Sequence, residues 1–352
     1  VITVGRYTEP QFAELMVKEG RADLVAFGRQ SLADPAMPKK AQEERLEDMT
    51  PCIACLQGCV ANMYAGNPVC CLTNPFLGHE AEPLEKAEEP KKVMVIGGGV
   101  AGLSAAFIAK ERGHEVTLYE AGDVLGGNMR LAAYPPGKGD ITNMIRSYIH
   151  RCQKDGVKIV MNCEVTPELI KEEKPDSVII ATGSKTLILP IEGIDNPAII
   201  HGSDLLDGKR GAGKKVLVVG GGMVGCETAA FLGEQEHDVT VIEFRDTVGA
   251  DVIHEHRVYL MKDFEDYGIK EITGAKVCKF YEDGVEYETA DGQRHESRGY
   301  DSVILSMGFR NYNPFAEQLE ELGQEVYVVG DATRARRALD ATKEAYAAAM
   351  QI

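Results

Sequence analysis

The sequence predicts an α/β protein in which two Rossmann-like dinucleotide-binding domains follow a cysteine-rich segment. Three observations carry this prediction: an internal repeat, a glycine motif within each copy of the repeat, and five of the nine cysteines gathered between Cys52 and Cys71. The 352 residues allow about two or three domains. Hydrophobic residues at 44% and charged residues at 26% are ordinary values for a globular protein, which argues against general disorder.

The charge and the cysteine content narrow the range of partners. A net charge of -17 would repel nucleic acid and anionic membranes, so neither is expected as a partner. The most apolar stretch, 93–109, contains three consecutive glycines and is interpreted as a strand, a turn and a helix rather than a membrane span. No signal peptide is visible, and nine cysteines without secretion signals indicate a reducing, cytoplasmic compartment. Clustered cysteines in that setting indicate metal or redox chemistry.

The chain begins with a strand, a helix and a second strand. The stretch VITVG predicts the first strand, and a helix near residues 10–19 carries Phe12, Leu15 and Met16 as its apolar positions. The stretch ADLVAFGR predicts the second strand. Further on, the charged and proline-containing residues 79–92 lack apolar periodicity and are interpreted as a surface linker.

The internal repeat predicts two dinucleotide-binding units. Residues 92–120 and 215–243 align without a gap at a constant offset of 123. Each copy has a β-branched strand, the motif G-x-G-x-x-G, a helix, a second strand, and an acid 18 residues after the third glycine. One glycine motif alone would be weak, but two complete copies in matching context argue against a chance match.

Each residue of the motif has a physical task. The first glycine permits the tight turn, the second lets the backbone approach a pyrophosphate, and the third allows close contact of helix and strand. Glu120 and Glu243 are expected to accept hydrogen bonds from adenosine ribose hydroxyls. An acid here disfavours a 2′-phosphate, so Glu243 favours NADH over NADPH, although the nearby Arg245 weakens that preference.

Two further motifs resemble the flavoprotein superfamily with two dinucleotide-binding domains. They are IIATGS at residues 179–184 and VYVVGDATRARRALDATKEAYAAAM from Val326 onward. The resemblance implies FAD at the first glycine loop, NAD(P)H at the second, and Asp331 at the FAD ribityl chain; a plain helix N-cap is the alternative role for Asp331. It also implies that an NAD(P)H domain, 206–299, is inserted in an FAD domain, 93–205 and 300–352. The residues expected at FAD are Gly97, Gly99, Gly102, Glu120, Gly127, Gly183, Gly330 and Asp331, and those at NADH are Gly220, Gly222, Gly225 and Glu243.

The cysteine segment, 49–78, has the spacing C-x2-C-x3-C-x11-C. The thiolates of Cys52, Cys55, Cys59 and Cys71 can converge on one [4Fe-4S] cluster. Zinc is the alternative, but structural zinc sites usually pair their ligands in two C-x-x-C knuckles, and this pattern is asymmetric. Cys70 competes with Cys71 for the fourth position.

The order of parts resembles one family across the whole chain: old-yellow-enzyme-like NADH:flavin oxidoreductases with a fused cluster and FAD/NAD(P)H module. This group includes 2,4-dienoyl-CoA reductase, 2-enoate reductase and the bile-acid-inducible flavin oxidoreductases. Its Cys-Leu-x-Asn-Pro motif is similar to CLTNP here and favours Cys71 as the fourth ligand. The resemblance implies that 1–48 is the C-terminal end of a (β/α)8 barrel that binds FMN phosphate through Gly5, Arg6, Gly28 and Arg29. For either arginine, an ordinary surface position is the alternative.

A complete barrel of this type needs about 250 residues, so the chain is expected to be the C-terminal part of a longer enzyme. The substrate-side catalytic residues are therefore expected upstream of Val1, and none is assigned within this sequence. The resemblance implies electron flow from NADH to FAD, to [4Fe-4S], to FMN, and then to the activated C=C bond of a small unsaturated acid or CoA thioester. FAD accepts the hydride pair from NADH and can release single electrons to the cluster. The sequence does not identify the substrate. It does not determine the oligomeric state either, and a homo-oligomer is one of the states that it allows.

Two rival interpretations use the same glycine loops. A disulfide reductase needs a redox cysteine pair beside the flavin, but GGNMRLAAYPPGKGD contains no cysteine and the stretch 225–276 contains only Cys226. Cys226 is interpreted as a packing residue, although a helix N-terminus would lower its pKa. An electron-input module without its own substrate site, similar to the small subunit of glutamate synthase, is the other rival; the barrel-like residues 1–35 speak against it.

Overall fold

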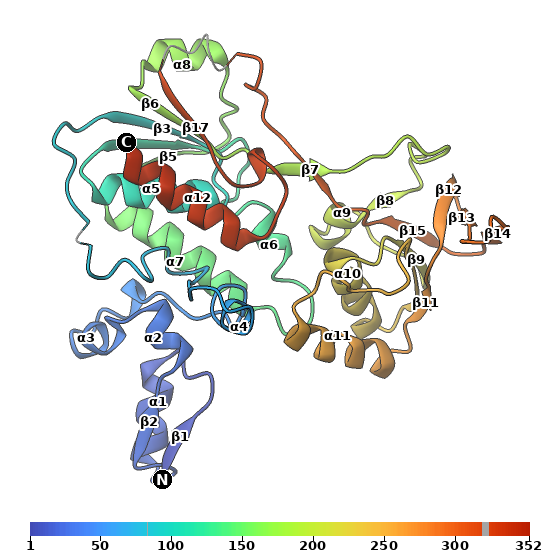
Figure 1. Cartoon of the computed structure of the whole chain (residues 1–352), viewed down its shortest axis with the longest axis horizontal. Coiled ribbons are helices and arrows are strands. Elements are labelled where there is room, and N and C mark those ends of the chain that lie inside the picture. The colour runs from blue at the N-terminus through green and yellow to red at the C-terminus, as the bar shows by residue number, and fades with distance from the viewer. Residues whose placement is uncertain (83, 319–323) are drawn as a thin grey trace. The chain divides into compact units, whose positions relative to one another are not determined.

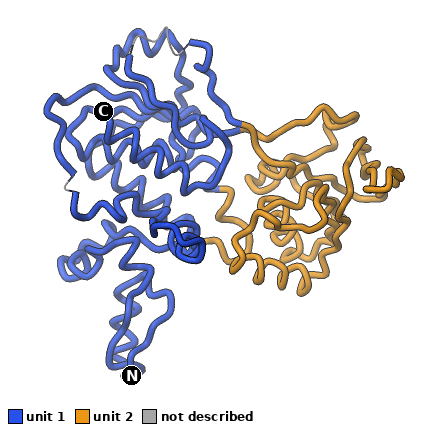
Figure 2. The backbone as a smooth tube through the Cα atoms, in the orientation of Figure 1, with its two compact units in different colours: residues 1–130, 140–184, 311–352 blue, residues 131–139, 185–310 orange. Residues whose placement is uncertain are grey.

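The computed structural model describes residues 1–82, 84–318 and 324–352, and the chain divides into two compact units. Unit 1 comprises residues 1–130, 140–184 and 311–352, and unit 2 comprises residues 131–139 and 185–310 (Figure 2). Both units contain a parallel sheet with helices, which confirms the predicted α/β fold with Rossmann-like domains.

Unit 1 is built on a parallel sheet with the strand order β17-β6-β3-β4-β5. The strands are β3 (Lys92–Ile96), β4 (Glu115–Tyr119), β5 (Lys158–Val160), β6 (Ser177–Ile180) and β17 (Glu325–Val328). Residues 93–96 and 177–180 are buried throughout, as expected for a parallel sheet with both faces covered.

Helix α5 (Val100–Glu111) packs on this sheet, and two further helices of unit 1 pack against α5. Helix α5 is buried from Val100 to Ala109 and packs against α7 (Asp140–Lys154) and α12 (Ala338–Gln351) (Figure 1). Ala345 and Ala349 of α12 are completely buried. Their small side chains allow α12 to approach α5 closely. Helices α6 (Asn128–Leu131) and α8 (Pro167–Glu173) and the 3₁₀ turn η3 (Gly330–Ala332) complete the set.

The start of the chain forms the predicted strand, helix and strand. Strand β1 (Ile2–Val4) pairs in parallel with β2 (Leu24–Ala26), and α1 (Pro10–Lys18) connects them. Pro10 at the first turn of α1 suits a position where the backbone N–H has no helical partner. The chain continues through α2 (Arg29–Ala33), α3 (Met37–Gln42), the 3₁₀ turn η1 (Leu46–Asp48) and α4 (Val60–Tyr64).

Unit 2 repeats the architecture, with a parallel sheet in the order β11-β10-β9-β15-β8. Its strands are β8 (Ile200–His201), β9 (Lys215–Val219), β10 (Asp238–Ile242), β11 (Lys270–Ile272) and β15 (Ser302–Leu305), and its helices are α9 (Gly202–Leu206), α10 (Met223–Glu234) and α11 (His254–Asp266). An antiparallel sheet of β12 (Lys276–Tyr281), β13 (Gly284–Glu288) and β14 (Arg294–Ser297) shares a core with it through Phe280 and Val285.

Unit 2 is larger than the range 206–299 expected from the sequence. Strands β8 and β15 lie outside that range, but both belong to its sheet. Residues 131–139 also belong to unit 2, where Lys138 forms an ion pair with Glu227. Strands β7 (Ser184–Thr186) and β16 (Phe309–Asn311) pair with each other at the residues where the division falls. The boundaries therefore follow sheet pairing between residues about 100 positions apart.

The predicted linker, 79–92, forms no helix or strand before Lys92 in the part that the structure describes. It is not wholly detached, since the ring of His79 stacks on Tyr346 at 4.8 Å. No helix among residues 1–82, 84–318 and 324–352 has both the length and the apolar composition to cross a membrane.

Candidate functional site

The first glycine loop joins β3 to α5 through close backbone contacts. Gly97 has a φ of +107°, and a Cβ there would lie 2.4 Å from the carbonyl oxygen of Ala181. Gly99 is the N-cap residue of α5. A Cβ on Gly102 would lie 1.9 Å from the carbonyl oxygen of Gly97. Only glycine allows this approach of helix and strand, which leaves the N-terminal amides of α5 at the carboxyl edge of the sheet.

Glu120 holds this loop from the end of β4. Its carboxylate accepts hydrogen bonds from the backbone N–H of Gly98 at 2.7 Å and of Gly122 at 2.8 Å. Each carboxylate oxygen has a second acceptor position, so a ribose hydroxyl can still donate to Glu120. The structure thus adds a backbone-fixing role to the predicted contact with ribose.

The second loop has the same geometry in unit 2. Gly220 has a φ of +105°, Gly222 is the N-cap residue of α10, and a Cβ on Gly225 would lie 1.8 Å from the carbonyl oxygen of Gly220. Glu243 is 8% exposed and accepts from the N–H of Gly221 at 2.5 Å and of Arg245 at 2.9 Å. The acid of each repeat therefore fixes the loop of its own repeat.

Asp251 is a residue at this loop that the sequence analysis missed. Its Oδ1 accepts a hydrogen bond from the N–H of Met223, the first residue of α10, at 2.9 Å. The carboxylate thus lies at a helix N-terminus that is suited to a pyrophosphate. No sequence signal marked Asp251, because it follows the end of β10 by nine residues in an irregular loop.

The other residues expected at FAD gather at the carboxyl edge of the unit 1 sheet. Gly127 lies against Gly99, since a Cβ added to Gly127 would be 3.2 Å from the Cα of Gly99. Gly183 follows β6. Gly330 begins η3 after β17, and the carboxylate of Asp331 accepts from the hydroxyl of Ser184 at 2.9 Å. The structure therefore brings IIATGS and Asp331 together.

The alternative role of Asp331 as a helix N-cap does not hold for α12. The N-cap residue of α12 is Arg337, and Asp331 instead accepts from the N–H of Arg336 at 3.0 Å, in the loop before the helix. The carboxylate fixes the polypeptide between β17 and α12.

The cysteine segment encloses a cavity. Cys52, Cys55, Cys59, Cys70 and Cys71 all line it. Apolar side chains of Leu32, Ile53, Leu56 and Leu72 form much of the rest of the wall. Among the described residues, no three His, Cys, Asp or Glu side chains are placed to hold a metal ion. The structure therefore places the predicted ligands around one cavity, but not close enough together to hold a single metal ion.

Burial raises the pKa of two thiols that line this cavity. It raises the pKa of Cys52, and it raises the pKa of Cys55 to about 12. Each of these two thiols also interacts electrostatically with Cys59 and Cys71, which raises both pKa values further, while the charge of Arg29 opposes the rise at Cys52. A positively charged group bound in the cavity would lower the pKa of Cys52 and of Cys55, because it favours the charged thiolate.

Cys70 has other partners. Its sulfur accepts from the side-chain amide of Asn62 at 3.3 Å and approaches the carbonyl oxygen of Gly58 at 3.7 Å.

Cys226 is fully buried, its thiol donates to the carbonyl oxygen of Gly221 at 3.2 Å, and burial raises its pKa to about 12. All nine cysteines lie in the described part of the chain and are free thiols there. The packing interpretation of Cys226 is therefore supported.

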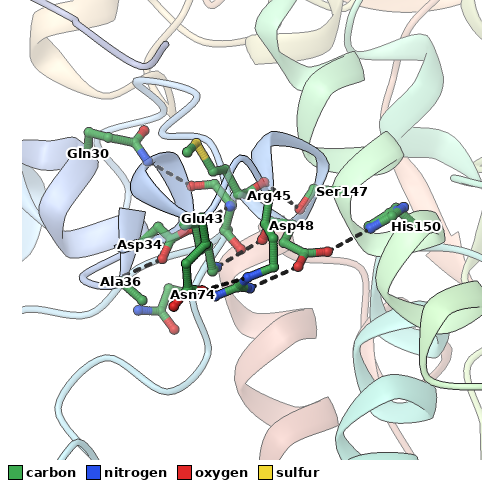
Figure 3. A network of polar contacts seen from close by, with 12 residues as sticks. Gln30, Asp34, Ala36, Glu43, Arg45, Asp48, Asn74, Ser147 and His150 are labelled. Atoms are coloured by element: carbon green, nitrogen blue, oxygen red, sulfur yellow. Dashed lines mark hydrogen bonds and ion pairs between the residues drawn. The ribbon is translucent and has the colours of Figure 1, made fainter. Parts of the chain in front are cut away.

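Helix α7 contacts the first residue of the cysteine segment and the residue before it. The hydroxyl of Ser147 donates to the carbonyl oxygen of Met49, and His150 Nε2 lies 3.0 Å from Asp48 Oδ1 (Figure 3). Burial would raise the pKa of Asp48, but hydrogen bonds from Lys154, His150 and Arg45 hold it well below its usual value.

The residues expected at FMN phosphate divide into two groups. Gly5 and Arg6 follow β1, and Gly28 and Arg29 follow β2, so the parallel pairing places both loops at one edge. Arg6 has a φ of +52° and forms an ion pair with Asp140. Arg29 lines the cysteine cavity. The sequence did not predict either contact.

The substrate-side catalytic residues are expected upstream of Val1, and the structure begins at that residue. The carbonyl oxygen of Val1 accepts a hydrogen bond from the N–H of Asp23 at 2.9 Å, so the contact between the first two strands extends to the first residue. The side chain of Val1 is exposed. None of these contacts bears on the catalytic residues, so their position upstream of Val1 stays a prediction.

Comparisons with known proteins agree with this geometry. The family described as pyridine nucleotide-disulphide oxidoreductase matches residues 91–351, and the NADH:flavin oxidoreductase / NADH oxidase family matches residues 1–48. An NADH oxidase from Thermoanaerobacter brockii is 37% identical across 100% of this chain and 55% of its own length. A cinnamate reductase from Clostridium sporogenes is 33% identical across 100% of this chain and 53% of its own length.

The solved structures give the same result. A complex of 2-naphthoyl-CoA reductase with 2-naphthoyl-CoA superposes with a TM-score of 0.95 at 34% identity, covering 100% of this chain and 54% of that one. The chain thus spans about half the length of the relatives that it matches. These findings confirm the resemblance drawn from the motifs: the chain belongs to the pyridine nucleotide-disulphide oxidoreductase family, in the group of 2-enoate and dienoyl-CoA reductase-like NADH:flavin oxidoreductases.

Proposed function

We propose that this chain is the electron-input part of a reductase in which electrons pass from NADH to FAD, to a [4Fe-4S] cluster, to FMN, and to an activated C=C bond. The observation that carries the proposal is the cysteine cavity, because its wall also contains Arg29 from the expected FMN side. Unit 1 holds this cavity together with the first glycine loop. These groups supply the redox chemistry, and the chain supplies their binding and orientation.

The cavity fits an iron-sulfur cluster by its donors and by its walls. Cys52 and Cys55 each interact electrostatically with Cys59 and with Cys71, but no such interaction links either of them to Cys70, which also lines the cavity. Apolar walls exclude water, which is one of the factors that set a cluster's potential. This supports Cys71 rather than Cys70 as the fourth ligand.

The two glycine loops fit different nucleotides. The first lies beside Gly330, where an added Cβ would be 3.1 Å from the Cβ of Ala101. Asp331, the next residue, suits the ribityl chain of FAD. The second loop is held by the buried acid Glu243, which follows β10. This acid suits the adenosine ribose of NADH and disfavours the 2′-phosphate of NADPH. Tightly bound FAD in unit 1 and exchanging NADH in unit 2 together make up the input side.

The residues before the cysteines fit the end of a barrel. Ile2, Val4 and Leu24 on the paired strands β1 and β2 are 66%, 70% and 60% exposed, although each is a large apolar side chain. Barrel strands of this kind are normally covered on both faces and paired on both edges. This supports FMN binding by Arg29, with Gly5, Arg6 and Gly28 at the same edge, in the full-length protein.

The substrate class follows from the relatives. A cinnamate reductase and a 2-naphthoyl-CoA reductase are named for an unsaturated acid and an aromatic CoA thioester. We therefore propose a small unsaturated acid or CoA thioester as substrate, in a cytoplasmic protein whose substrate-side catalytic residues lie upstream of Val1.

The test uses the full-length protein purified without oxygen. We expect FAD, FMN, and about four iron and four sulfide per chain, together with NADH-dependent reduction of an α,β-unsaturated acid or thioester. One tightly bound zinc without iron would refute the cluster. Reduction of the flavins by NADH without reduction of any such substrate would favour an electron-input module without its own substrate site.

A further inference from the structure

Helix α2 carries a buried glutamine whose carboxamide nitrogen and oxygen both form hydrogen bonds with the backbone at the start of the cysteine segment. Gln30 is 3% exposed. Its Nε2 donates to the carbonyl oxygen of Thr50 at 3.0 Å (Figure 3). Its Oε1 accepts from the N–H of Cys52 at 2.8 Å. The carboxamide thus spans the two residues that bracket Pro51.

The same helix is tied to both ends of the cysteine segment. Asp34, directly after α2 and 3% exposed, accepts from the N–H of Thr50 at 2.9 Å. Asn74, three residues after Cys71, donates its side-chain amide to the carbonyl oxygen of Leu32 at 2.9 Å. One short helix therefore fixes the backbone before the first cysteine and after the last.

The backbone between these ties needs outside support. Residues 49–59 form no helix or strand, so hydrogen bonds of regular structure do not hold them. Ala54 and Leu56 have φ values of +51° and +58°, a region that side chains other than glycine rarely adopt. Such a conformation persists only where the surroundings impose it. Among the described residues, Gln30 supplies the hydrogen bond to the backbone N–H of Cys52.

We propose that Gln30 is a positioning residue that holds Cys52 in the orientation in which its thiol can bind the cluster. The inference rests on the proposed function, since it assumes the cluster. Gln30 takes up the N–H of Cys52, so this N–H is not free to turn toward the cluster sulfur atoms. Hydrogen bonds to sulfur and net charge are two of the factors that set a cluster's potential. Gln30 therefore affects both the retention of the cluster and its redox properties.

The experiment compares three variants of the full-length protein. Gln30→Leu removes both hydrogen bonds, and Gln30→Glu keeps an acceptor for the N–H of Cys52. Gln42→Leu makes the same change at an exposed position on α3 and serves as the matched control. The measurements are iron and sulfide content, the rate of cluster loss to an iron chelator, and the electron paramagnetic resonance spectrum and midpoint potential of the cluster.

We expect Gln30→Leu to lose its cluster at least fivefold faster than wild type, and the cluster that remains to have a changed spectrum and potential. Gln30→Glu should lose the cluster more slowly than Gln30→Leu, because it keeps the acceptor for the N–H of Cys52 and loses only the donor to Thr50. Its cluster should have a lower midpoint potential because of the added negative charge. Gln42→Leu should match wild type in every measurement.

Three results would overturn the inference, and they can be told apart. A wild-type protein without an iron-sulfur cluster would refute the proposed function and this inference with it. A wild-type cluster that Gln30→Leu leaves unchanged in spectrum, potential and rate of loss would refute the inference alone. If Gln30→Leu loses the cluster faster but the remaining cluster has the wild-type spectrum and potential, Gln30 only stabilises the fold.

Discussion

Replacing Gly225 by alanine is expected to weaken NADH binding while FAD stays bound. The added Cβ would lie 1.8 Å from the carbonyl oxygen of Gly220 and 2.9 Å from its carbonyl carbon, whereas ordinary contacts begin near 3.4 Å. Both atoms belong to the backbone, so no side chain can rotate away. Helix α10 must therefore move away from the loop after β9, and its N-terminal amides move with it.

The size of the effect follows from this overlap. Inserting a carbon into a closely packed site costs about 1–3 kcal/mol. If all of this free energy appears in NADH binding, the affinity falls by about 5- to 150-fold. The first glycine loop lies in unit 1 and is unchanged by the substitution, so the FAD content should equal that of wild type.

The assay is anaerobic stopped-flow reduction of the bound FAD at increasing NADH concentration. The variant should need correspondingly more NADH for half-maximal rate, while dithionite reduces its FAD as in wild type. Gly102→Ala is the counterpart in the first loop, with an added Cβ 1.9 Å from the carbonyl oxygen of Gly97, and it should lose FAD instead. Gly211→Ala, in unit 2 with no atom within 4 Å of the added Cβ, is the control.

The result that would refute the reasoning is equally specific. If Gly225→Ala loses FAD while Gly102→Ala retains it, the two nucleotides are assigned to the wrong loops. If Gly225→Ala shows the wild-type dependence on NADH, the close contact with Gly220 does not position the binding amides.

Four further predictions address other groups. Glu243→Gln should shift the preference between NADH and NADPH toward NADPH by about tenfold, because the repulsion of a 2′-phosphate is lost; an unchanged ratio of flavin reduction rates would contradict this. Asp251→Asn should tighten NADH binding several-fold in a titration, since the carboxylate at α10 competes with the pyrophosphate; weaker binding would show that Asp251 supports the site. Cys59→Ala should abolish the visible absorbance of the cluster, whereas Cys70→Ser should retain it. Asp48→Asn should lower the free energy of unfolding by about 1 kcal/mol at pH 7. Because folding lowers the pKa of Asp48, this difference should persist above about pH 5 and shrink as the pH falls below about 4, as denaturant titrations at several pH values can check.

The repeat and the cysteine run could be recognised in the sequence because each depends on residues that lie close together in the chain. The motif from Lys92 to Glu120 contains its own strand, turn and helix, and the contact of Gly102 with Gly97 spans five residues. The match of pattern to geometry is repeated from Lys215 to Glu243. The helix at Pro10–Lys18 was visible for the same reason, since its apolar period and its starting proline lie within nine residues.

The boundaries of unit 2 were not readable in this way. Strand β8 joins the sheet by pairing with β15, about 100 residues later. Lys138 belongs to unit 2, where it forms an ion pair with Glu227. Neither β8, which has two residues, nor a single lysine has a pattern of its own. Such contacts arise from packing between distant segments, and one sequence carries no local signal of them.

The candidate site shows the same division between sequence and structure. The sequence by itself predicted the chemistry: two glycine loops with their acids for dinucleotides, and a run of cysteines for an iron-sulfur cluster. Only the tertiary structure decided how the parts are held: Arg29 in the wall of the cysteine cavity, Asp251 at the start of α10, and Gln30 on the backbone of Cys52. The physical reason is that motifs of a few neighbouring residues specify local backbone geometry, whereas a buried polar side chain acquires its role only when folding brings its partner to it.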